Sequence, residues 1–211
     1  MKTTRICLLR HGETDWNAQK RIQGQIDVGL NTTGRTQALV AARRLAHEPI
    51  RRIYASDLKR ALETAGPIAE RLGLPVQPHV GIRERHYGCL QGLTADQVAA
   101  HMPDIHERYR RRDAHWEFSG GESLTAFAAR AIGAVETLAA AHPGETLLLV
   151  THGGVLDVLY RHATGRDLGS PRDFPIPNAT LNWLEVGGGS FSVRSWNDGR
   201  HREPALEEAL P

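Results

Sequence analysis

The sequence predicts an α/β fold: a three-layer α/β/α sandwich around a mostly parallel sheet, with an antiparallel edge strand and a helical cap insertion. Short aliphatic runs alternate with segments whose apolar residues recur at helical spacing, which is the order of elements in proteins with parallel sheets. The last two apolar segments are joined by a glycine turn instead, which predicts a hairpin at one end of the sheet.

The first half of the chain alternates between buried strands and amphipathic helices. Strands are expected where short apolar runs occur, and helices where apolar residues recur every third or fourth position. Gly73 ends the second of these helices, and Gly66-Pro67 inside it predicts a kink. The expected elements are strands at 6–9 and 52–55, a helix that opens at Thr33-Gly34 with apolar positions 38, 39, 41, 42 and 45, and a helix over 59–72.

The second half begins with a polar stretch, about 93–120, which we interpret as a helical cap inserted into the fold. Ser123 then provides the N-cap of a long helix that ends near His142, and a buried strand follows at 147–151. A further helix opens around Val155. The hairpin is predicted from a weak alternation over 181–186, a glycine turn at 187–189 and a strand over 191–195.

Composition indicates an ordinary soluble globular protein. The chain has 211 residues, 24% of them charged and 40% hydrophobic, and its formal net charge of +2 gives no argument for nucleic acid as a partner. The longest apolar run, 147–150, is too short to cross a bilayer, and the two cysteines form no disulfide framework. We therefore expect a cytoplasmic protein with a single catalytic domain over 1–200 and a C-terminal tail over 201–211.

Polar residues gather where each predicted strand ends. The carboxyl ends of parallel strands meet at one edge of a sheet, and ligands of α/β proteins bind outside that edge. Arginine, histidine and glutamate side chains gathered there predict a site for a small anion, most naturally a phosphate. The clusters are 10–14, 56–60, 83–86 and 151–154.

Two of these clusters contain a His-Gly pair, His11-Gly12 and His152-Gly153, each directly after a short aliphatic strand. One such pair is unremarkable in a chain with 11 histidines, and alone it would be interpreted as a capped strand end. Two pairs in equivalent places favour a shared function, with glycine where the backbone comes close to another group. We expect the two imidazoles to meet face to face around one oxyanion, with arginines completing the ring.

The segment LRHGETDWN at positions 9–17 resembles the signature of the histidine phosphatase superfamily, in its phosphoglycerate mutase-like branch. That branch includes phosphoglycerate mutases and phosphatases of the broad-specificity or α-ribazole type. Further similar segments follow in the family's order, so the resemblance spans most of residues 5–185. They are 21–24, 30–34, 54–61, 84–92, 121–123 and 151–154.

The resemblance implies a role for each polar group. His11 would be the nucleophile that takes the phosphoryl group on Nε2, with its other ring nitrogen donating to a backbone carbonyl. Arg10, Arg60 and a protonated His152 would hold the phosphate oxygens and the charge of the transition state. Glu84 would protonate the leaving alkoxide and then activate water. The substrate-binding residues implied in the same way are Asn17, Gln23, Gly24, Tyr87 and Gly153.

Glu84 stands between Arg83 and Arg85, and cations next to a carboxyl favour its ionised form, which opposes the acid role. Neighbouring side chains of an extended segment point to opposite faces, so we expect both arginines to face away from the pocket. A phosphate dianion bound beside Glu84 would favour the protonated carboxyl.

A phosphatase and a cofactor-dependent phosphoglycerate mutase would share this core. Residues 84–93 are close to the mutase version, yet Thr94 stands near the place of a mutase lysine, the segment before 121–123 is short, and Gly154 stands where mutases tend to have asparagine. A short segment over the site would exclude water poorly from a phosphohistidine, which favours hydrolysis. The sequence therefore predicts a phosphatase, with a mutase primed by 2,3-bisphosphoglycerate as the first alternative and a non-catalytic phospho-ligand binding module as the second.

Other ligands receive little support from the sequence. Zinc-binding spacings and a P-loop are both missing from it, so we expect hydrolysis without a metal or other cofactor. The basic run 108–112 is interpreted as a solvated helix face or as a grip on an anionic part of the substrate, ahead of a nucleic-acid patch. The expected partner is a small phosphorylated metabolite, with no nucleic acid and no membrane. The oligomeric state stays open, with a homodimer as one option.

Overall fold

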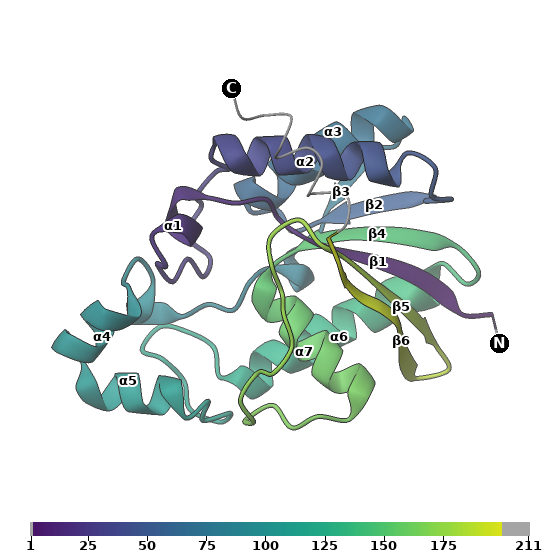
Figure 1. The fold of residues 1–211 in the computed structure, drawn as a ribbon. Coiled ribbons are helices and arrows are strands. Elements are labelled where there is room, and N and C mark those ends of the chain that lie inside the picture. The colour runs from purple at the N-terminus through teal and green to yellow at the C-terminus, as the bar shows by residue number, and fades with distance from the viewer. Residues whose placement is uncertain (1, 200–211) are drawn as a thin grey trace.

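One mixed sheet, with the strand order β3-β2-β4-β1-β5-β6, forms the middle layer of the protein (Figure 1). In the computed structural model, which describes residues 2–199, β1, β2, β3 and β4 pair in parallel, whereas β5 and β6 add an antiparallel end. This confirms the predicted sheet. The strands are β1 (Thr4–Arg10), β2 (Arg52–Ala55), β3 (Val76–Pro78), β4 (Thr146–Thr151), β5 (Leu181–Gly187) and β6 (Ser190–Asp198).

Helices cover both faces of the sheet, which confirms the three-layer sandwich. One face packs against α2 and α3, and the other against α6 and α7 (Figure 1). The helices are α1 (Asp15–Ala18), α2 (Thr32–Leu45), α3 (Lys59–Leu72), α4 (Ala95–His101), α5 (Pro103–Arg110), α6 (Leu124–Ala141) and α7 (Gly153–Thr164), with 3-10 turns at Val80–Ile82 and Gly88–Leu90.

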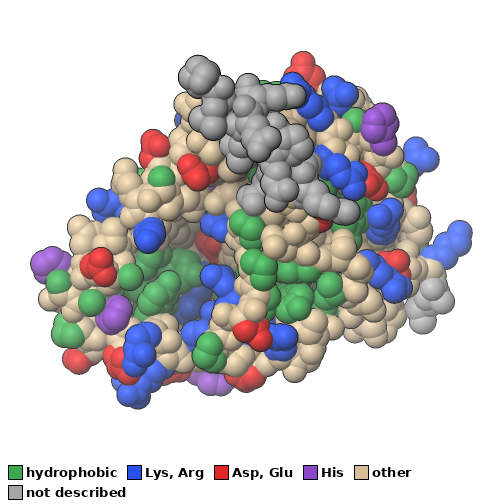
Figure 2. Space-filling model, in the orientation of Figure 1, with side chains coloured by type: hydrophobic (Ala, Val, Ile, Leu, Met, Phe, Trp, Pro, Cys, Tyr) green, Lys and Arg blue, Asp and Glu red, His purple; other side chains and the backbone are tan. Residues whose placement is uncertain are grey.

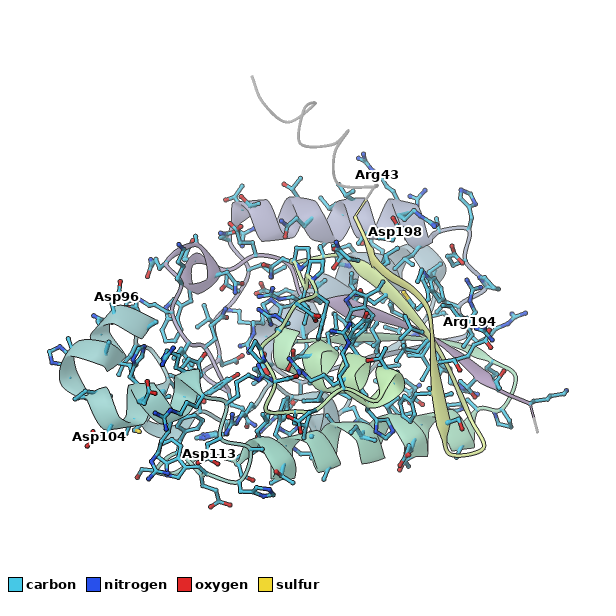
Figure 3. The ribbon with its side chains drawn as sticks, turned by 60° about the horizontal axis from the view of Figure 1, so that its bottom comes forward. Arg43, Asp96, Asp104, Asp113, Arg194 and Asp198 are labelled. Atoms are coloured by element: carbon cyan, nitrogen blue, oxygen red, sulfur yellow. The ribbon has the colours of Figure 1, made fainter. Side chains whose placement is uncertain are left out.

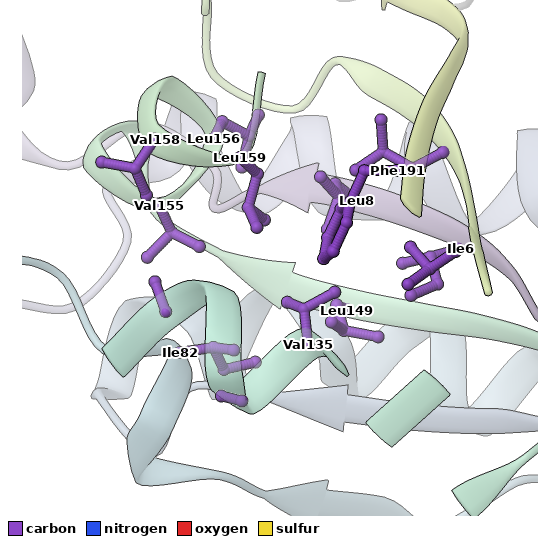
Figure 4. Close-up of a cluster of buried hydrophobic side chains, with 14 of the residues drawn as sticks. Ile6, Leu8, Ile82, Val135, Leu149, Val155, Leu156, Val158, Leu159 and Phe191 are labelled. Carbon is purple, nitrogen blue, oxygen red and sulfur yellow. The ribbon is translucent and has the colours of Figure 1, made fainter. Parts of the chain in front are cut away.

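Strand β1 is buried on both of its faces. Ile6 and Leu8 join the core formed with α6 and α7 (Figure 4), while Cys7 and Leu9 join the core formed with α2 and α3. Successive side chains of a strand point to opposite faces, so a strand covered on both sides is apolar at every position. This double burial fixes the register with β4, in which Arg10 lies opposite Thr151, and holds both strand ends at one edge of the sheet.

The predicted start of α2 is wrong by one residue. α2 begins at Thr32 because Asn31 is its N-cap, and the Asn31 side chain accepts a hydrogen bond from the Gly34 N–H. Leu39 was also predicted among the packed positions, but it is 53% exposed and lies outside the buried stripe of the helix. α3 occupies the predicted residues, continues as one helix through Gly66-Pro67 and ends at a left-handed Gly73.

α6 is the long helix predicted after Ser123, whose side chain caps it by accepting from the Ala126 N–H. In residues 2–199 it is the one helix long and apolar enough to cross a membrane by composition, with a mean hydropathy of 1.3 over 18 residues, which the argument from run length did not consider. Its stripe of Phe127, Ala131 and Val135 packs into the core against the sheet (Figure 4), as the core helix of a globular fold does.

The predicted cap contains α4 and α5, so the very polar part of this segment is helical as far as Arg110. It has a small core of its own, in which Val98 and Phe118 pack with Leu90. Asp96, Asp104 and Asp113 are exposed residues of this segment (Figure 3). The domain boundaries stay a prediction, and the predicted tail over 201–211 lies outside the described residues.

Candidate active site

The two His-Gly pairs come together at the carboxyl edge of the sheet. His11 follows β1 and His152 follows the adjacent β4, and the His11 N–H donates to the Thr151 carbonyl at 2.8 Å. Their ring centroids lie 5.2 Å apart at an interplanar angle of 58°. The rings therefore meet, as predicted, but they are tilted rather than face to face.

His11 has the geometry of a nitrogen nucleophile. Its Nδ1 lies 2.7 Å from the Gly12 carbonyl oxygen, an acceptor, so Nδ1 carries the proton and Nε2 keeps its lone pair. Burial, together with Arg60 and Arg10, holds the pKa of His11 well below its usual 6.5, so the ring is neutral at pH 7. The predicted bond from the second ring nitrogen to a backbone carbonyl is thus confirmed.

His152 is wholly buried. Its protonated state was predicted for the site that holds a phosphate, and it stays a prediction. Burial, then Arg60, His11 and Arg10, hold its pKa well below 6.5, so in the site without phosphate the ring is neutral. Neither of its ring nitrogens has a hydrogen-bond partner within residues 2–199. A buried polar atom without a partner is costly, and an oxyanion between the rings would both satisfy it and favour its protonation.

Arg10 and Arg60 bring two buried positive charges to the same place. The Arg60 guanidinium, 1% exposed as a residue, donates to the carbonyls of Gly24 at 2.7 Å and Ile26 at 3.0 Å. Arg10 donates to the Ile176 carbonyl. Burial lowers the pKa of each arginine to about 10, and the Nε atom of each has no partner in the described chain. These buried cations have carbonyl partners but no paired carboxylate, which suits an incoming phosphate.

The Glu84 carboxylate lies against the first turn of α7. Its Oε2 accepts from the Gly154 N–H at 2.9 Å and its Oε1 from the Arg85 N–H at 2.8 Å. The flanking arginines have other partners: Arg83 donates to Asp57, and Arg85 donates to the carbonyl of Glu122. Arg85 nevertheless lines the outer part of the pocket, so the prediction that both arginines face away from it is wrong for Arg85, whose guanidinium the Glu122 carbonyl holds beside the cavity. Neither guanidinium forms an ion pair with Glu84, so the acid role is compatible with this sequence.

Arg130 of α6 holds the backbone on which Glu84 sits. Its guanidinium donates to the carbonyls of Gly81, Arg83 and Glu84, at 3.0, 3.1 and 3.3 Å. A two-pronged ion pair with Glu122, at 2.8 Å for each bond, fixes its orientation. The segment after the Val80–Ile82 turn is irregular, so these bonds take the place of a sheet ladder in positioning the carboxylate.

The predicted residues line a hollow between α1, the cap and α7, in which arginine and lysine side chains are visible in Figure 2. It has an inner compartment of about 390 Å³ beside His11, and an adjoining outer one of about 410 Å³ above α7. Arg10, Glu84 and Tyr87 line both compartments. The inner one is also lined by Asn17, Gln23, Gly24 and Arg60, and the outer one by Gly153.

Asn17 can offer the Nδ2 group of its side-chain amide to this hollow. Its Oδ1 accepts from the Thr14 N–H at 3.1 Å within the capping box of α1, which leaves Nδ2 for a ligand. Gln23 is 8% exposed, and its Oε1 has no partner in the part of the chain that is described. The Asn17 N–H group is therefore available to a phosphate oxygen, whereas the free Gln23 Oε1 is an acceptor and suits a donor group of the ligand.

Sequence reasoning missed two residues of this site. Arg172, between α7 and β5, lines both compartments, and its place in a proline-rich loop gave no periodic signal. Gly154 is the second: a Cβ there would lie 2.1 Å from Glu84 Oε1, whereas a Cβ on Gly153 would only touch Arg10, at 3.4 Å. The close approach predicted after His152 therefore falls one residue later. After His11 it falls at Gly12 as expected, since a Cβ there would lie 2.5 Å from the Gly34 carbonyl oxygen.

Gly154→Ala is expected to lower kcat for an alkyl phosphomonoester by about 100-fold, because the new methyl group displaces the acid. The new Cβ also lies 3.2 Å from the buried Phe127 ring, so the melting temperature of the variant is measured beside its kcat to separate the displaced acid from a weakened fold. Gly133→Ala on α6, where a Cβ meets nothing within 4 Å, is the matched control and should keep full activity. Equal kcat for both variants would contradict the placement of Glu84.

The two neutral histidines predict how stability depends on pH. In the unfolded chain both titrate near pH 6.5, whereas in the folded site their pKa values lie well below it. Below about pH 6.5 the unfolded state therefore binds more protons, so stability is full above this pH and falls as the pH decreases, by up to about 1.4 kcal/mol per pH unit for each ring. Urea unfolding at pH 7.5, 6.5 and 5.5 measures this slope, and His152→Gln should roughly halve it. An unchanged slope in that variant would argue against a neutral His152.

Among residues 2–199, no group of three or more histidine, cysteine, aspartate or glutamate side chains is arranged to hold a metal ion. What the site offers instead is a neutral imidazole, a second buried imidazole, two buried guanidinium groups and a carboxylate. This set can bind a phosphate, accept its phosphoryl group on nitrogen and supply a proton to the departing oxygen.

The family model of the histidine phosphatase superfamily (branch 1) matches residues 6–199. A metal-independent phosphoserine phosphatase of Arabidopsis thaliana is 39% identical over 204 residues, covering 95% of this chain and 84% of that protein. A glucosyl-3-phosphoglycerate phosphatase of Mycobacterium tuberculosis is 41% identical over 196 residues, covering 89% and 82%. Phosphoglycerate mutase-like protein 4 of Arabidopsis thaliana is 38% identical over 202 residues, covering 94% and 86%.

A solved structure shows the same fold. YhfR of Bacillus stearothermophilus has a TM-score of 0.88 at 33% identity, and the match covers 94% of this chain and 98% of that one.

Proposed function

The chain belongs to the histidine phosphatase superfamily, branch 1, and is a phosphomonoester hydrolase of that type; we propose that His11 Nε2 carries the phosphoryl group between substrate and water. The observation that carries this proposal is the hydrogen bond from His11 Nδ1 to the Gly12 carbonyl. It directs the free lone pair of Nε2 into a compartment lined by Arg10 and Arg60.

In the first step, Nε2 of His11 attacks phosphorus, the P–O bond to the alcohol breaks, and protonated Glu84 gives its proton to the departing oxygen. Arg10, Arg60 and His152 stabilise the charge on the transferring group, because buried donors act in a medium of low dielectric. In the second step, Glu84 takes a proton from water, the water oxygen attacks phosphorus, and the N–P bond breaks. The balance is one phosphomonoester and one water consumed, one alcohol and one inorganic phosphate formed.

The roles of the other lining residues are part of the proposal. Asn17 Nδ2 would donate to a phosphate oxygen, while Gln23 and Gly24 would shape the inner compartment. Tyr87 and Gly153 would contact the alcohol half of the substrate, since both line the outer compartment.

Hydrolysis is favoured over mutase chemistry by Gly154. The resemblance described above places asparagine there in mutases, and in this chain any side chain at that position would meet Glu84 Oε1. One relative is named as mutase-like, so phosphoglycerate mutase activity is the second candidate.

We propose that the reaction needs no metal, in line with the Arabidopsis relative that is named metal-independent. A cytoplasmic location remains a proposal as well; it is supported by Cys7 and Cys89, which are both free thiols.

One experiment separates these possibilities. Release of inorganic phosphate is measured in EDTA from a panel that includes phosphoserine, glucosyl-3-phosphoglycerate, a nucleotide, α-ribazole phosphate and p-nitrophenyl phosphate. Interconversion of 3-phosphoglycerate is measured beside it, with and without 2,3-bisphosphoglycerate. Phosphate release in EDTA supports the phosphatase; isomerisation that depends on the bisphosphate and exceeds phosphate release supports the mutase. Binding of phosphate with turnover of none of these compounds leaves only the binding module.

A further inference from the structure

The hollow extends well beyond what a phosphate needs. The outer compartment, about 410 Å³, adjoins the inner one, and the two share Arg10, Glu84, Tyr87, Tyr109 and Arg172. A phosphate group occupies a small part of this space. The group that Glu84 protonates must lie beside Glu84 and away from His11, so the alcohol half of the substrate extends into the outer compartment.

The lining of this compartment is strongly cationic. Five arginines and two carboxylates contribute to it, in a space with aromatic and aliphatic walls formed by Tyr87, Tyr109, Leu124 and Phe127. The arginines are Arg10, Arg85, Arg110, Arg112 and Arg172, and the carboxylates are Glu84 and Asp157.

Four of these arginines already have partners, Arg10 through the Ile176 carbonyl. Arg112 forms an ion pair with Asp157 at 2.6 Å, and Arg110 with Glu107 at 3.0 Å. Arg85 donates to the Glu122 carbonyl and lies over the Phe118 ring, with 4.6 Å from its Cζ to the ring centroid. Arg112 and Arg110 are therefore neutralised locally, and Arg85 is held in place by a carbonyl and a ring.

Arg172 differs from Arg110 and Arg112 in having no partner of opposite charge among residues 2–199, and from Arg85 in being exposed. Its side chain is exposed, and no carboxylate among residues 2–199 forms an ion pair with it; the adjacent Asp173 is paired with Arg166. Its positive charge acts on two residues that line the hollow. It lowers the pKa of Arg10, and it counteracts part of the rise that burial causes in the pKa of Tyr109. A free guanidinium at the junction of two compartments is available to a ligand.

We propose that the alcohol half of the substrate carries a second oxyanion, a carboxylate or a second phosphate, and that Arg172 is the specificity-determining residue that binds it. Arg85 contributes a fixed positive charge to the same compartment, and the two tyrosines provide its wall. This inference rests on the proposed function, since it assumes that the phosphoryl group occupies the inner compartment. It disfavours alcohols that are neutral or carry only an ammonium group, because an unpaired guanidinium repels a cation and gains little from a hydroxyl.

Matched substrates test this directly. Phosphoserine and phosphoethanolamine differ only in the carboxylate, and 1,3-propanediol bisphosphate and its monophosphate differ only in the second phosphate. In at least one pair, we expect kcat/KM to be about tenfold higher for the member that carries the second anionic group, as for one charge-assisted hydrogen bond at a partly exposed site. The pair that shows the preference identifies whether the second group is a carboxylate or a phosphate.

Variants assign the preference to Arg172. Arg172→Gln should lower kcat/KM for the member with the second anion several-fold more than for its partner, so that most of the preference disappears, and Arg172→Lys should restore part of it. The preference of the wild type should also shrink as salt is raised from 50 to 500 mM, because Arg172 is exposed to solvent. Arg43→Gln on α2, which lies apart from the cap in Figure 3, is the matched exposed-arginine control and should behave as the wild type.

The outcomes separate this inference from the proposed function. A wild type that hydrolyses both members of each pair equally, or an Arg172→Gln variant that keeps the preference, would overturn the inference and leave the phosphatase intact. An Arg172→Gln variant that loses activity on all substrates by the same factor would also overturn it, since Arg172 would then act on the phosphoryl group or the fold. Failure of the wild type on every phosphomonoester would count against the proposed function itself.

Discussion

His11→Ala is expected to lower the turnover of every phosphomonoester by about 10⁴-fold or more, because His11 is the one imidazole among the described residues that lines the inner compartment. His11 is the imidazole whose Nδ1 is fixed by a carbonyl, while both nitrogens of His152 lack such a partner within the described residues. Rapid quenching of the wild type with substrate should yield a phosphorylated protein that is labile to acid and stable to base, and the variant should yield none.

The control for this variant is His47→Ala, which removes an exposed histidine from the turn after α2 and should leave turnover unchanged. Binding of inorganic phosphate by His11→Ala, measured by calorimetry, separates loss of chemistry from loss of the site: Arg10, Arg60 and His152 remain, so binding should persist. A His11→Ala variant with a normal phosphoenzyme would place the nucleophile elsewhere and end the proposed mechanism.

Glu84→Gln is expected to lower kcat for alkyl phosphomonoesters by about 10²–10³-fold, because the amide keeps the shape of the side chain but cannot deliver a proton. The first step with p-nitrophenyl phosphate should be nearly normal, since p-nitrophenolate leaves without protonation. Hydrolysis of the phosphohistidine also needs the carboxylate, so this substrate should give a burst of p-nitrophenol followed by slow turnover, with phosphoenzyme accumulating.

Glu136→Gln removes an exposed carboxylate from α6 and is the matched control for this experiment. Both variants should have the same melting temperature within a degree or two if Glu84 acts in chemistry and not in folding. Equal losses on the alkyl and the p-nitrophenyl substrates, without a burst, would mean that Glu84 is not the acid of the first step.

Much of the fold was predictable because its signals are local. Residues 59–72 form the expected helix because the signals for it are local: apolar residues recur at helical spacing within the segment, and Gly73 follows directly as its C-cap. The strands at β1 and β4 were equally clear, because a strand buried on both faces is apolar at each position. The start of α2 was predicted wrongly because several residues that can cap a helix lie side by side. Asn31 is the N-cap, but two threonines follow it directly, and the predicted start was the second of them, Thr33.

The candidate site was predictable to the extent that its residues follow strands or lie in segments similar to a family signature. His11, His152, Arg10, Arg60 and Glu84 were named on those grounds. The structure places four of them on the wall of one hollow, and it buries His152 beside His11 with 5.2 Å between the ring centroids. Their roles in the reaction remain a proposal until the variants above are measured.

The sequence by itself determined the alternation of elements, the strand ends that carry polar groups and the identity of the groups that gather there, because each of these depends on neighbours along the chain. Only the tertiary structure decided the tilt of the two rings, the neutral state of His152, the contact of Gly154 with Glu84 and the exposure of Arg172 at the junction of two compartments. Protonation and contact depend on distances between segments that lie far apart in the sequence, and burial sets the free-energy cost of a charge. Neither these distances nor the burial can be inferred from neighbouring residues along the chain.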